Sequence, residues 1–167
     1  MAAEEQSHDD IVQLAAFVVG DEEYVVDIRR VREIIRVVPI TPVRKGPRYV
    51  EGVINLRGSV IPIVDLRRRF DLPHLESANR KIMITVIEGR VLGLMVDGVT
   101  EVVRLPRSAI RPAPGLLDAA HAPFFLGVCH YRGRTLVLLN VKNVVGSEQP
   151  IGPPDVEGLA PDAGSKE

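Results

Sequence analysis

Residues 52–58 read GVINLRG, and residues 127–133 read GVCHYRG, 75 positions further along the chain. A second pair of segments is related in the same way: residues 31–36 read VREIIR and residues 99–104 read VTEVVR, 68 positions apart. The repeat units of solenoid proteins are shorter, roughly 20–50 residues. The spacing therefore predicts an internal duplication in which each copy is one small domain.

Each copy is predicted to be all-β, built from short antiparallel strands. Val and Ile make up 38 of the 167 residues, and β-branched residues favour strands. Apolar runs are paired across short turns that contain Gly, at 14–19 with 24–28, 53–56 with 60–64, 82–87 with 91–96, and 127–131 with 135–139. About five such strands in each copy would close most simply as an SH3-like or OB-like barrel. Two barrels side by side would leave a groove between them, which is a common place for binding.

The domain boundaries follow from composition. Residues 1–10 are polar and residues 147–167 are rich in Pro, Gly and acids, so we expect mobile or disordered tails around a folded part at 11–146. The first barrel is expected at about 14–70 and the second at about 80–146, and an exchange of the N-terminal strand between them is left open.

Two short helices are predicted at 66–70 and 141–145. Asp65 and Asn140 directly precede them and are residue types that cap helix N-termini. A carboxylate site at Asp65 is the less favoured interpretation.

Composition narrows the function classes. No apolar run approaches the 18 residues that a membrane-spanning helix needs, and the N-terminus lacks the pattern of a secretory signal. We therefore expect a cytoplasmic protein without direct membrane insertion. The single cysteine, Cys129, excludes a disulfide framework and a zinc site made of cysteines. Residues 28–81 carry thirteen Lys or Arg against five Asp or Glu, so a nucleic-acid-binding barrel is the alternative function. Aromatic residues are only 4% and Trp is absent, which disfavours base stacking.

Several stretches together resemble the CheW family over residues 12–146. They are YVVDI at 24–28, VREI at 31–34, YVEGVINLRG at 49–58, IPIVDLR at 61–67 and VDGV at 96–99. The resemblance implies two intertwined, five-stranded SH3-like barrels in tandem. It also implies a non-enzymatic adaptor, without cofactor or metal, that couples the cytoplasmic tips of methyl-accepting chemoreceptors to the regulatory domain of a CheA-like histidine kinase. Such an adaptor is expected to be monomeric in isolation, to bind no nucleic acid and to be associated with receptor arrays.

The resemblance also assigns positions. The receptor-facing residues, in the groove between the barrels, would be Val31, Glu33, Gly52, Arg57, Val99 and Val102. The kinase-facing surface of the first barrel would include Ile40, Thr41 and Val43. Arg32 stands where the family usually has Gln, and Glu51 where Lys is frequent, which points to a divergent receptor or to a chemosensory pathway not devoted to flagella.

Local reasoning adds expectations for individual side chains. Arg57 in its turn is interpreted as a bidentate partner for a receptor carboxylate, with a solvated turn arginine as the alternative. Glu33 is expected to bind a partner or to pair internally with Arg36 or Arg57, whereas no binding role is expected for Glu101. Regular alternation from Val31 would put Ile34 on the opposite face from Val31, and therefore in the core.

Catalytic residues are not expected. Cys129 and His130 are adjacent in a predicted strand, so they point to opposite faces and form no nucleophile–base pair. The chain contains no Walker A, nucleophile-elbow or paired-histidine zinc motif.

Overall fold

The computed structural model describes residues 10–74, 76–112 and 122–145. The tails predicted at 1–10 and 147–167 lie, except for Asp10, outside the described residues. The strands are β1 (Ile11–Val19), β2 (Glu22–Asp27), β3 (Val31–Arg36), β4 (Val50–Leu56), β5 (Ser59–Asp65), β6 (Lys81–Ile87), β7 (Arg90–Val96), β8 (Gly98–Pro106), β9 (Phe125–Tyr131) and β10 (Arg134–Leu139). The helices are η1 (Ile28–Arg30), α2 (Leu66–Arg69), η2 (Arg107–Ala109), η3 (Ala122–Phe124) and α3 (Val141–Val144).

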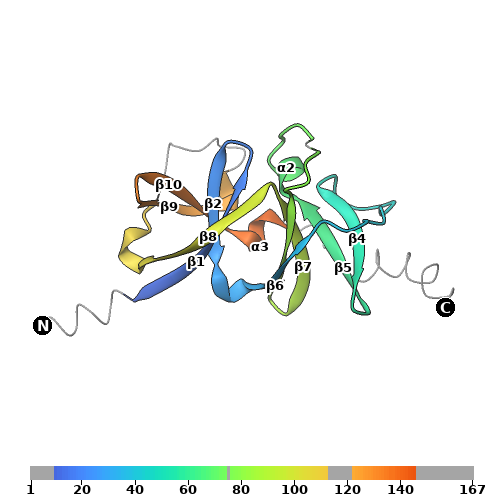
Figure 1. Cartoon of the computed structure of the whole chain (residues 1–167), viewed down its shortest axis with the longest axis horizontal. Helices are drawn as coiled ribbons and strands as arrows, with labels where there is room; N and C mark the ends of the chain where they lie inside the picture. Colours follow the sequence, from blue (N-terminus) through green and yellow to red (C-terminus); the bar gives the residue numbers. More distant parts are fainter. Residues whose placement is uncertain (1–9, 75, 113–121, 146–167) are drawn as a thin grey trace, which may run out of the picture.

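The strands form two five-stranded sheets that lie side by side (Figure 1). Their orders are β8-β1-β2-β10-β9, here called barrel A, and β3-β6-β7-β5-β4, called barrel B. Each of β1 to β5 has a counterpart five strands later in the chain, from β6 to β10. When every strand in one order is exchanged for its counterpart, the other order results. The duplication is therefore a property of the fold as well as of the sequence.

The boundaries expected from the sequence, 14–70 and 80–146, are wrong as barrel boundaries. Barrel A takes β1 and β2 from the first copy and β8 to β10 from the second, and barrel B has the reciprocal composition. The exchange is sealed by two parallel pairings, β2 with β10 and β5 with β7. Two strands are exchanged rather than a single N-terminal strand, because each hairpin finds its apolar partners in the other copy.

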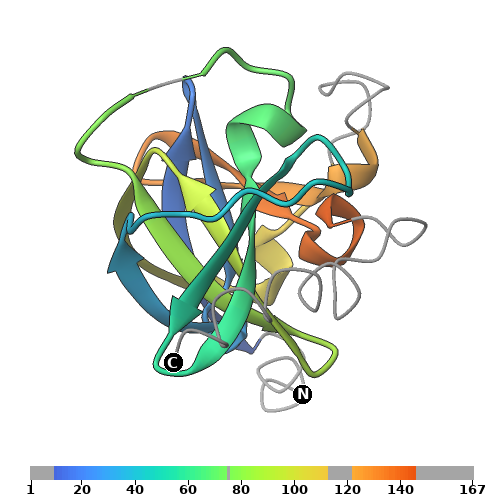
Figure 2. The ribbon, with the colours of Figure 1, turned by 90° about the vertical axis from the view of Figure 1, so that its right-hand side faces the viewer.

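Each barrel is closed by a backbone β-bridge that lies outside the named strands. Thr41 pairs with Val53 in barrel B, and Arg111 pairs with Val128 in barrel A. Figure 2 looks onto barrel B, with β4 and β5 nearest the viewer.

Hairpin turns at Arg57-Gly58 and Arg132-Gly133 have positive φ at both residues, with Arg57 at 52° and Arg132 at 51°. This geometry matches the twist of antiparallel strands and explains the repeated Arg-Gly pair.

The seam between the barrels is filled by the largest of three apolar clusters. This cluster joins side chains of both barrels, such as Phe17 and Tyr24 of barrel A with Met83 and Leu94 of barrel B. Smaller clusters fill the interior of each barrel. Burial raises the pKa of Tyr24 to about 12. Because the middle of the seam is packed, a partner can reach it only along its rim.

Both predicted N-caps are confirmed, although Asp65 does more than cap. Its carboxylate accepts a hydrogen bond from the backbone N–H of Arg67 and pairs with the Arg80 guanidinium at 2.8 Å. Asp65 is 1% exposed and Arg80 is 5% exposed. Asp97 contacts Arg80 at 3.5 Å and also pairs with Arg67. We call Asp65, Arg67, Arg80 and Asp97 the α2 ion cluster.

The α2 ion cluster links the two barrels. The Asp97 carboxylate oxygen that pairs with Arg67 also accepts a hydrogen bond of 2.7 Å from the N–H of Gly20, in the β1–β2 turn of barrel A. Asp65 and Arg80 belong to barrel B, so the cluster fixes the position of one barrel against the other.

Candidate functional site: the rim of the barrel seam

The edge strands β3 and β8 carry the same β-bulge at the same place in the repeat. In β3 the register with β6 shifts between Val31 and Glu33, and in β8 the register with β1 shifts opposite Ala16 and Phe17, at the position of Thr100. A bulge inserts one residue and re-aims the side chains on either side of it. The bulges therefore decide which residues of these strands face the seam.

Val31 and Ile34 both face the seam as a result. Val31 pairs with Thr85 and Ile34 with Met83, whereas Glu33 pairs with Ile84, which belongs to the interior cluster of barrel B. In β8, Val99 pairs with Phe17 and Val102 with Ala15, again on the seam side. The four residues Val31, Ile34, Val99 and Val102 are here called the rim.

The expectation that Ile34 is a core residue is wrong. Ile34 is 41% exposed, and its counterpart Val102 is 50% exposed. Val31 and Val99 are half-buried and pack on the seam cluster. The regular alternation assumed from the sequence fails at the bulge, which places Val31 and Ile34 on one face. The repeat itself held the missing signal, because Ile34 is equivalent to Val102, which the family resemblance places at the receptor surface.

Glu33 forms an ion pair with Arg57, so β3 is tied to the β4–β5 turn. The Arg57 side chain remains 68% exposed and that of Glu33 is 30% exposed. The internal pairing considered for Glu33 is thus present, and its partner is Arg57 rather than Arg36. Both side chains still lie at the surface, where a partner could compete for them.

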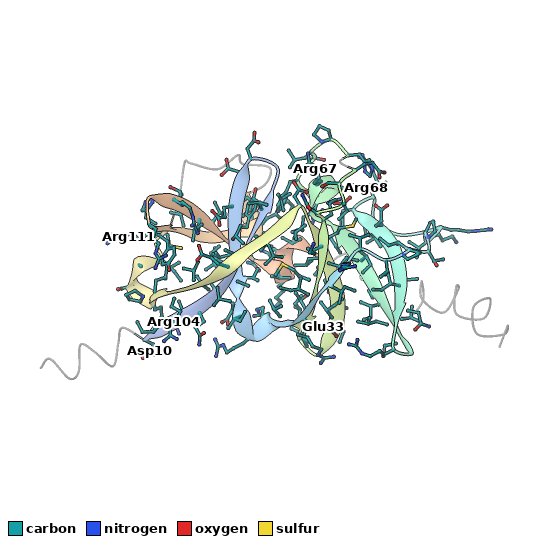
Figure 3. All side chains as sticks on the ribbon, in the orientation of Figure 1. Asp10, Glu33, Arg67, Arg68, Arg104 and Arg111 are labelled. Atoms are coloured by element: carbon teal, nitrogen blue, oxygen red, sulfur yellow. The ribbon has the colours of Figure 1, made fainter. Side chains whose placement is uncertain are left out.

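The equivalent glutamate in barrel A has a different arrangement. Glu101 pairs with Arg134 at 2.7 Å, and Arg134 also pairs with Glu23 at 3.1 Å. The Glu101 carboxylate raises the pKa of Arg134. In Figure 3, Glu33 lies on barrel B and Arg104, which follows Glu101 on β8, lies on barrel A. Arg132, which is the counterpart of Arg57, stacks on Tyr131 with its guanidinium carbon 5.1 Å from the ring centre.

Gly52 lies in the wall of barrel B rather than at the rim. It is buried, and a Cβ at this position would lie 2.2 Å from the carbonyl oxygen of Thr41. Its φ of 154° is also one that side chains rarely adopt. Gly52 therefore allows the segment after β3 to close the barrel.

The residues expected to face the kinase belong to that closing segment. Thr41 is exposed and its backbone pairs with Val53, while Ile40 packs on the interior cluster of barrel B and Val43 on the seam cluster. The structure thus brings Ile40 and Thr41 against Gly52.

Reactive side chains do not gather at the rim. Cys129 is 1% exposed, and burial raises the pKa of its thiol, while His130 points outward and contacts the Thr135 hydroxyl. Their predicted placement on opposite faces is confirmed. Within residues 10–74, 76–112 and 122–145, no three His, Cys, Asp or Glu side chains are placed to hold a metal ion. In the same residues, no helix has the length and apolar character needed to cross a membrane.

Three of the thirteen cations in the basic stretch 28–81 are engaged within the fold. Arg67 and Arg80 are nearly buried in the α2 ion cluster, and Arg57 is paired with Glu33. The nucleic-acid alternative consequently loses part of the charge that suggested it.

Comparison with known proteins agrees with this architecture. Residues 13–149 match the model of the CheW-like domain. The chain belongs to the CheW family. It is 39% identical over 138 residues to the chemotaxis protein CheW of Rhizobium meliloti (strain 1021), and the aligned region covers 82% of this chain and 89% of that protein. It is 32% identical over 132 residues to the protein FrzA of Myxococcus xanthus, and the aligned region covers 77% of this chain and 82% of that protein.

A solved structure supports both the family and the fold. The crystal structure of the scaffolding protein TtCheW from Thermoanaerobacter tengcongensis superimposes with a TM-score of 0.72 at 32% identity. The match covers 78% of this chain and 90% of that one. The predicted fold class of two SH3-like barrels is confirmed, and the CheW-family chain is an adaptor or scaffold of the chemotaxis type.

Proposed function

We propose that this chain is a non-catalytic adaptor that couples methyl-accepting chemoreceptors to a CheA-like histidine kinase in a receptor array. The receptor tip, a helical hairpin, binds along the rim of the seam. The observation that carries the proposal is the paired bulge, which turns Val31 and Ile34 in one barrel and Val99 and Val102 in the other toward the same seam.

Apolar rim residues suit a helical partner. Ile34 and Val102 leave about half of their side-chain surface in water, and covering such surface gains roughly 25 cal/mol per Å². A helix packs its apolar stripe into exposed side chains of this kind. The neighbouring Glu33–Arg57 pair supplies charges of both signs that can exchange their internal partner for one on the receptor.

The kinase is proposed to bind the closing segment of barrel B at Ile40, Thr41 and Val43. Ile40 and Thr41 lie against Gly52 and Val53 on the wall of barrel B, whereas Val43 packs on the seam cluster. A kinase that binds mainly at Ile40 and Thr41 leaves the four rim side chains available to the receptor, so both partners can be held at once, which is what coupling requires.

Charge reversal at the turn arginine tests the receptor surface. We expect Arg57→Glu to weaken binding of a receptor hairpin fragment about tenfold, which corresponds to about 1.4 kcal/mol, and to leave binding of the kinase regulatory domain unchanged. Arg132→Glu, in the equivalent turn of barrel A, is the matched control and should leave both affinities unchanged. Both affinities can be measured by titration calorimetry.

Two results would contradict the proposal. If the wild-type chain binds neither fragment, the adaptor function is wrong. If Arg57→Glu mainly lowers the melting temperature, Arg57 is a structural residue and the receptor surface lies elsewhere.

A further inference from the structure

The solvent-exposed surface of β3 and of the residues after it combines cations with exposed apolar side chains. Ile34 and Val37 are each 41% exposed and Val38 is 36% exposed. Arg32 and Arg36 are also exposed, and their side chains contact no acceptor in the described part of the chain. These five residues are here called the β3 strip.

The equivalent region of barrel A has only part of this pattern. Val102, at the position of Ile34, is 50% exposed, but Leu105, at the position of Val37, is 5% exposed. Thr100 replaces Arg32, which leaves Arg104 as the one cation at these positions. The β3 strip is therefore not a consequence of the duplicated fold, and it is specific to barrel B.

A segment of this chain has the complementary chemistry. Residues 146–167 contain five carboxylates against one lysine, and three large aliphatic residues, Ile151, Val156 and Leu159. Residues 1–9 are also acidic, with three carboxylates, but Met1 is their one large apolar residue. Charge of the opposite sign and matching apolar content both favour the C-terminal segment over the N-terminal one.

The position of its attachment also fits. The carbonyl of Val145 accepts a hydrogen bond of 3.1 Å from the Tyr49 hydroxyl, so the segment leaves the fold beside β4 of barrel B. The segment of 22 residues can extend to about 70 Å. A domain of this size has a radius of gyration of about 14 Å, so the segment is long enough to reach β3.

We propose that residues 146–167 dock on the β3 strip of the same molecule. Their carboxylates meet Arg32 and Arg36, and their aliphatic side chains cover Ile34, Val37 and Val38. Because Ile34 also belongs to the rim, the docked segment competes with any protein that binds there. The docking itself does not depend on what that protein is.

A spin label in the segment tests the proposal in the full chain. Ala160→Cys gives a single reactive thiol, since the native Cys129 is 1% exposed. We expect the label to cause loss of the amide NMR signals of residues 31–38 and to leave those of β8 intact. The unmodified chain, treated with the same reagent, should show no loss. At about 1 M salt the Debye length falls to about 3 Å, and the β3 signals should return.

Charge variants separate docking from chance proximity. The double variant Arg32→Glu/Arg36→Glu should restore the β3 signals, whereas Arg104→Glu, the counterpart of Arg36, should not. If the double variant fails to fold, Asp155→Asn/Glu157→Gln in the segment should restore the signals equally, and it leaves the barrels unaltered.

Several outcomes would overturn the proposal. They are loss of signals centred on β8 or on the cations at 44–48, no loss at all, and loss that persists in both sets of charge variants. Loss that appears only between an isotope-labelled chain and a second, spin-labelled chain would mean that the segment docks on another copy, and would overturn it as well.

Discussion

The two places where a short helix meets a hairpin turn are related by the duplication, yet their electrostatics differ. At α2, Asp97 contacts Arg67, Arg80 and the N–H of Gly20, and all three acidic or basic side chains are nearly buried. At α3, Lys142 stands in the place of Arg67 and pairs with Glu88 of the β6–β7 turn at 2.8 Å. Both of those side chains are more than 60% exposed.

This difference shows that the fold does not require the α2 ion cluster. The same topology is closed at the other end by a solvated ion pair and by the Asn140 cap, whose side chain accepts from the N–H of Asn143. Buried charges lose their hydration, and each depends on its partner to offset that loss. The α2 end is therefore the more fragile one and also the one that holds the two barrels in a single position.

Removal of a buried cation should have the largest effect. We expect Arg80→Met to lower the free energy of unfolding by about 3–5 kcal/mol, because the buried Asp65 carboxylate loses its counter-charge. Lys142→Met at the α3 end should leave the urea midpoint nearly unchanged, since exposed pairs contribute little. Adding Asp65→Asn to Arg80→Met should recover part of the loss. Equal shifts for Arg80→Met and Lys142→Met would show that the two ends do not differ.

A second pair of variants compares the walls of the two barrels. Gly52→Ala should cost about 2 kcal/mol, because its φ of 154° and the Thr41 carbonyl at 2.2 Å both oppose a side chain. The equivalent Gly127→Ala meets the Arg111 carbonyl at 2.6 Å without the unfavourable φ, so a smaller loss is expected. Both losses can be measured by urea unfolding. A larger loss for Gly127→Ala would mean that the backbone angle is not the main cause of the destabilisation.

The smallest effect concerns the exposed ion pair at α3. A hydrogen bond from Lys142 lowers the pKa of Glu88 in the folded chain. A lowered folded-state pKa contributes stability above the unfolded-state value of about 4.3, and this contribution disappears as the pH falls through the folded-state value. The melting temperature of Glu88→Gln should therefore lie slightly below that of the wild type at pH 7, and the difference should shrink as the pH is lowered below the unfolded-state value. A difference that stays constant on acidification would show that the pair is not its cause.

Local features of the fold were predictable because they depend on neighbours in sequence. The turn residues Arg57-Gly58 and Arg132-Gly133, and the caps Asp65 and Asn140, were found where the sequence pattern placed them. The apolar runs of the hairpins match the observed strands to within a few residues.

Features that depend on distant partners were not predictable. Asp65 was expected to be only a cap, and nothing local marks Arg80 as its buried counter-ion, 15 residues away. Ile34 was assigned to the core because a bulge leaves no local mark in a run of apolar and charged residues, and only its equivalence to Val102 in the repeat indicates the exposed position.

Strand period, turn residues and repeated motifs are local properties, so the duplicated β-domain of the CheW family can be recognised in the amino-acid sequence alone. How the copies share their strands, which edge residues face the seam and where charges are buried depend on the three-dimensional fold. Those features follow from packing between segments that are far apart in the sequence, from 30 residues for Val64 and Leu94 to 113 residues for Tyr24 and Val137. There the burial of apolar surface, and not the local pattern, selects the partner.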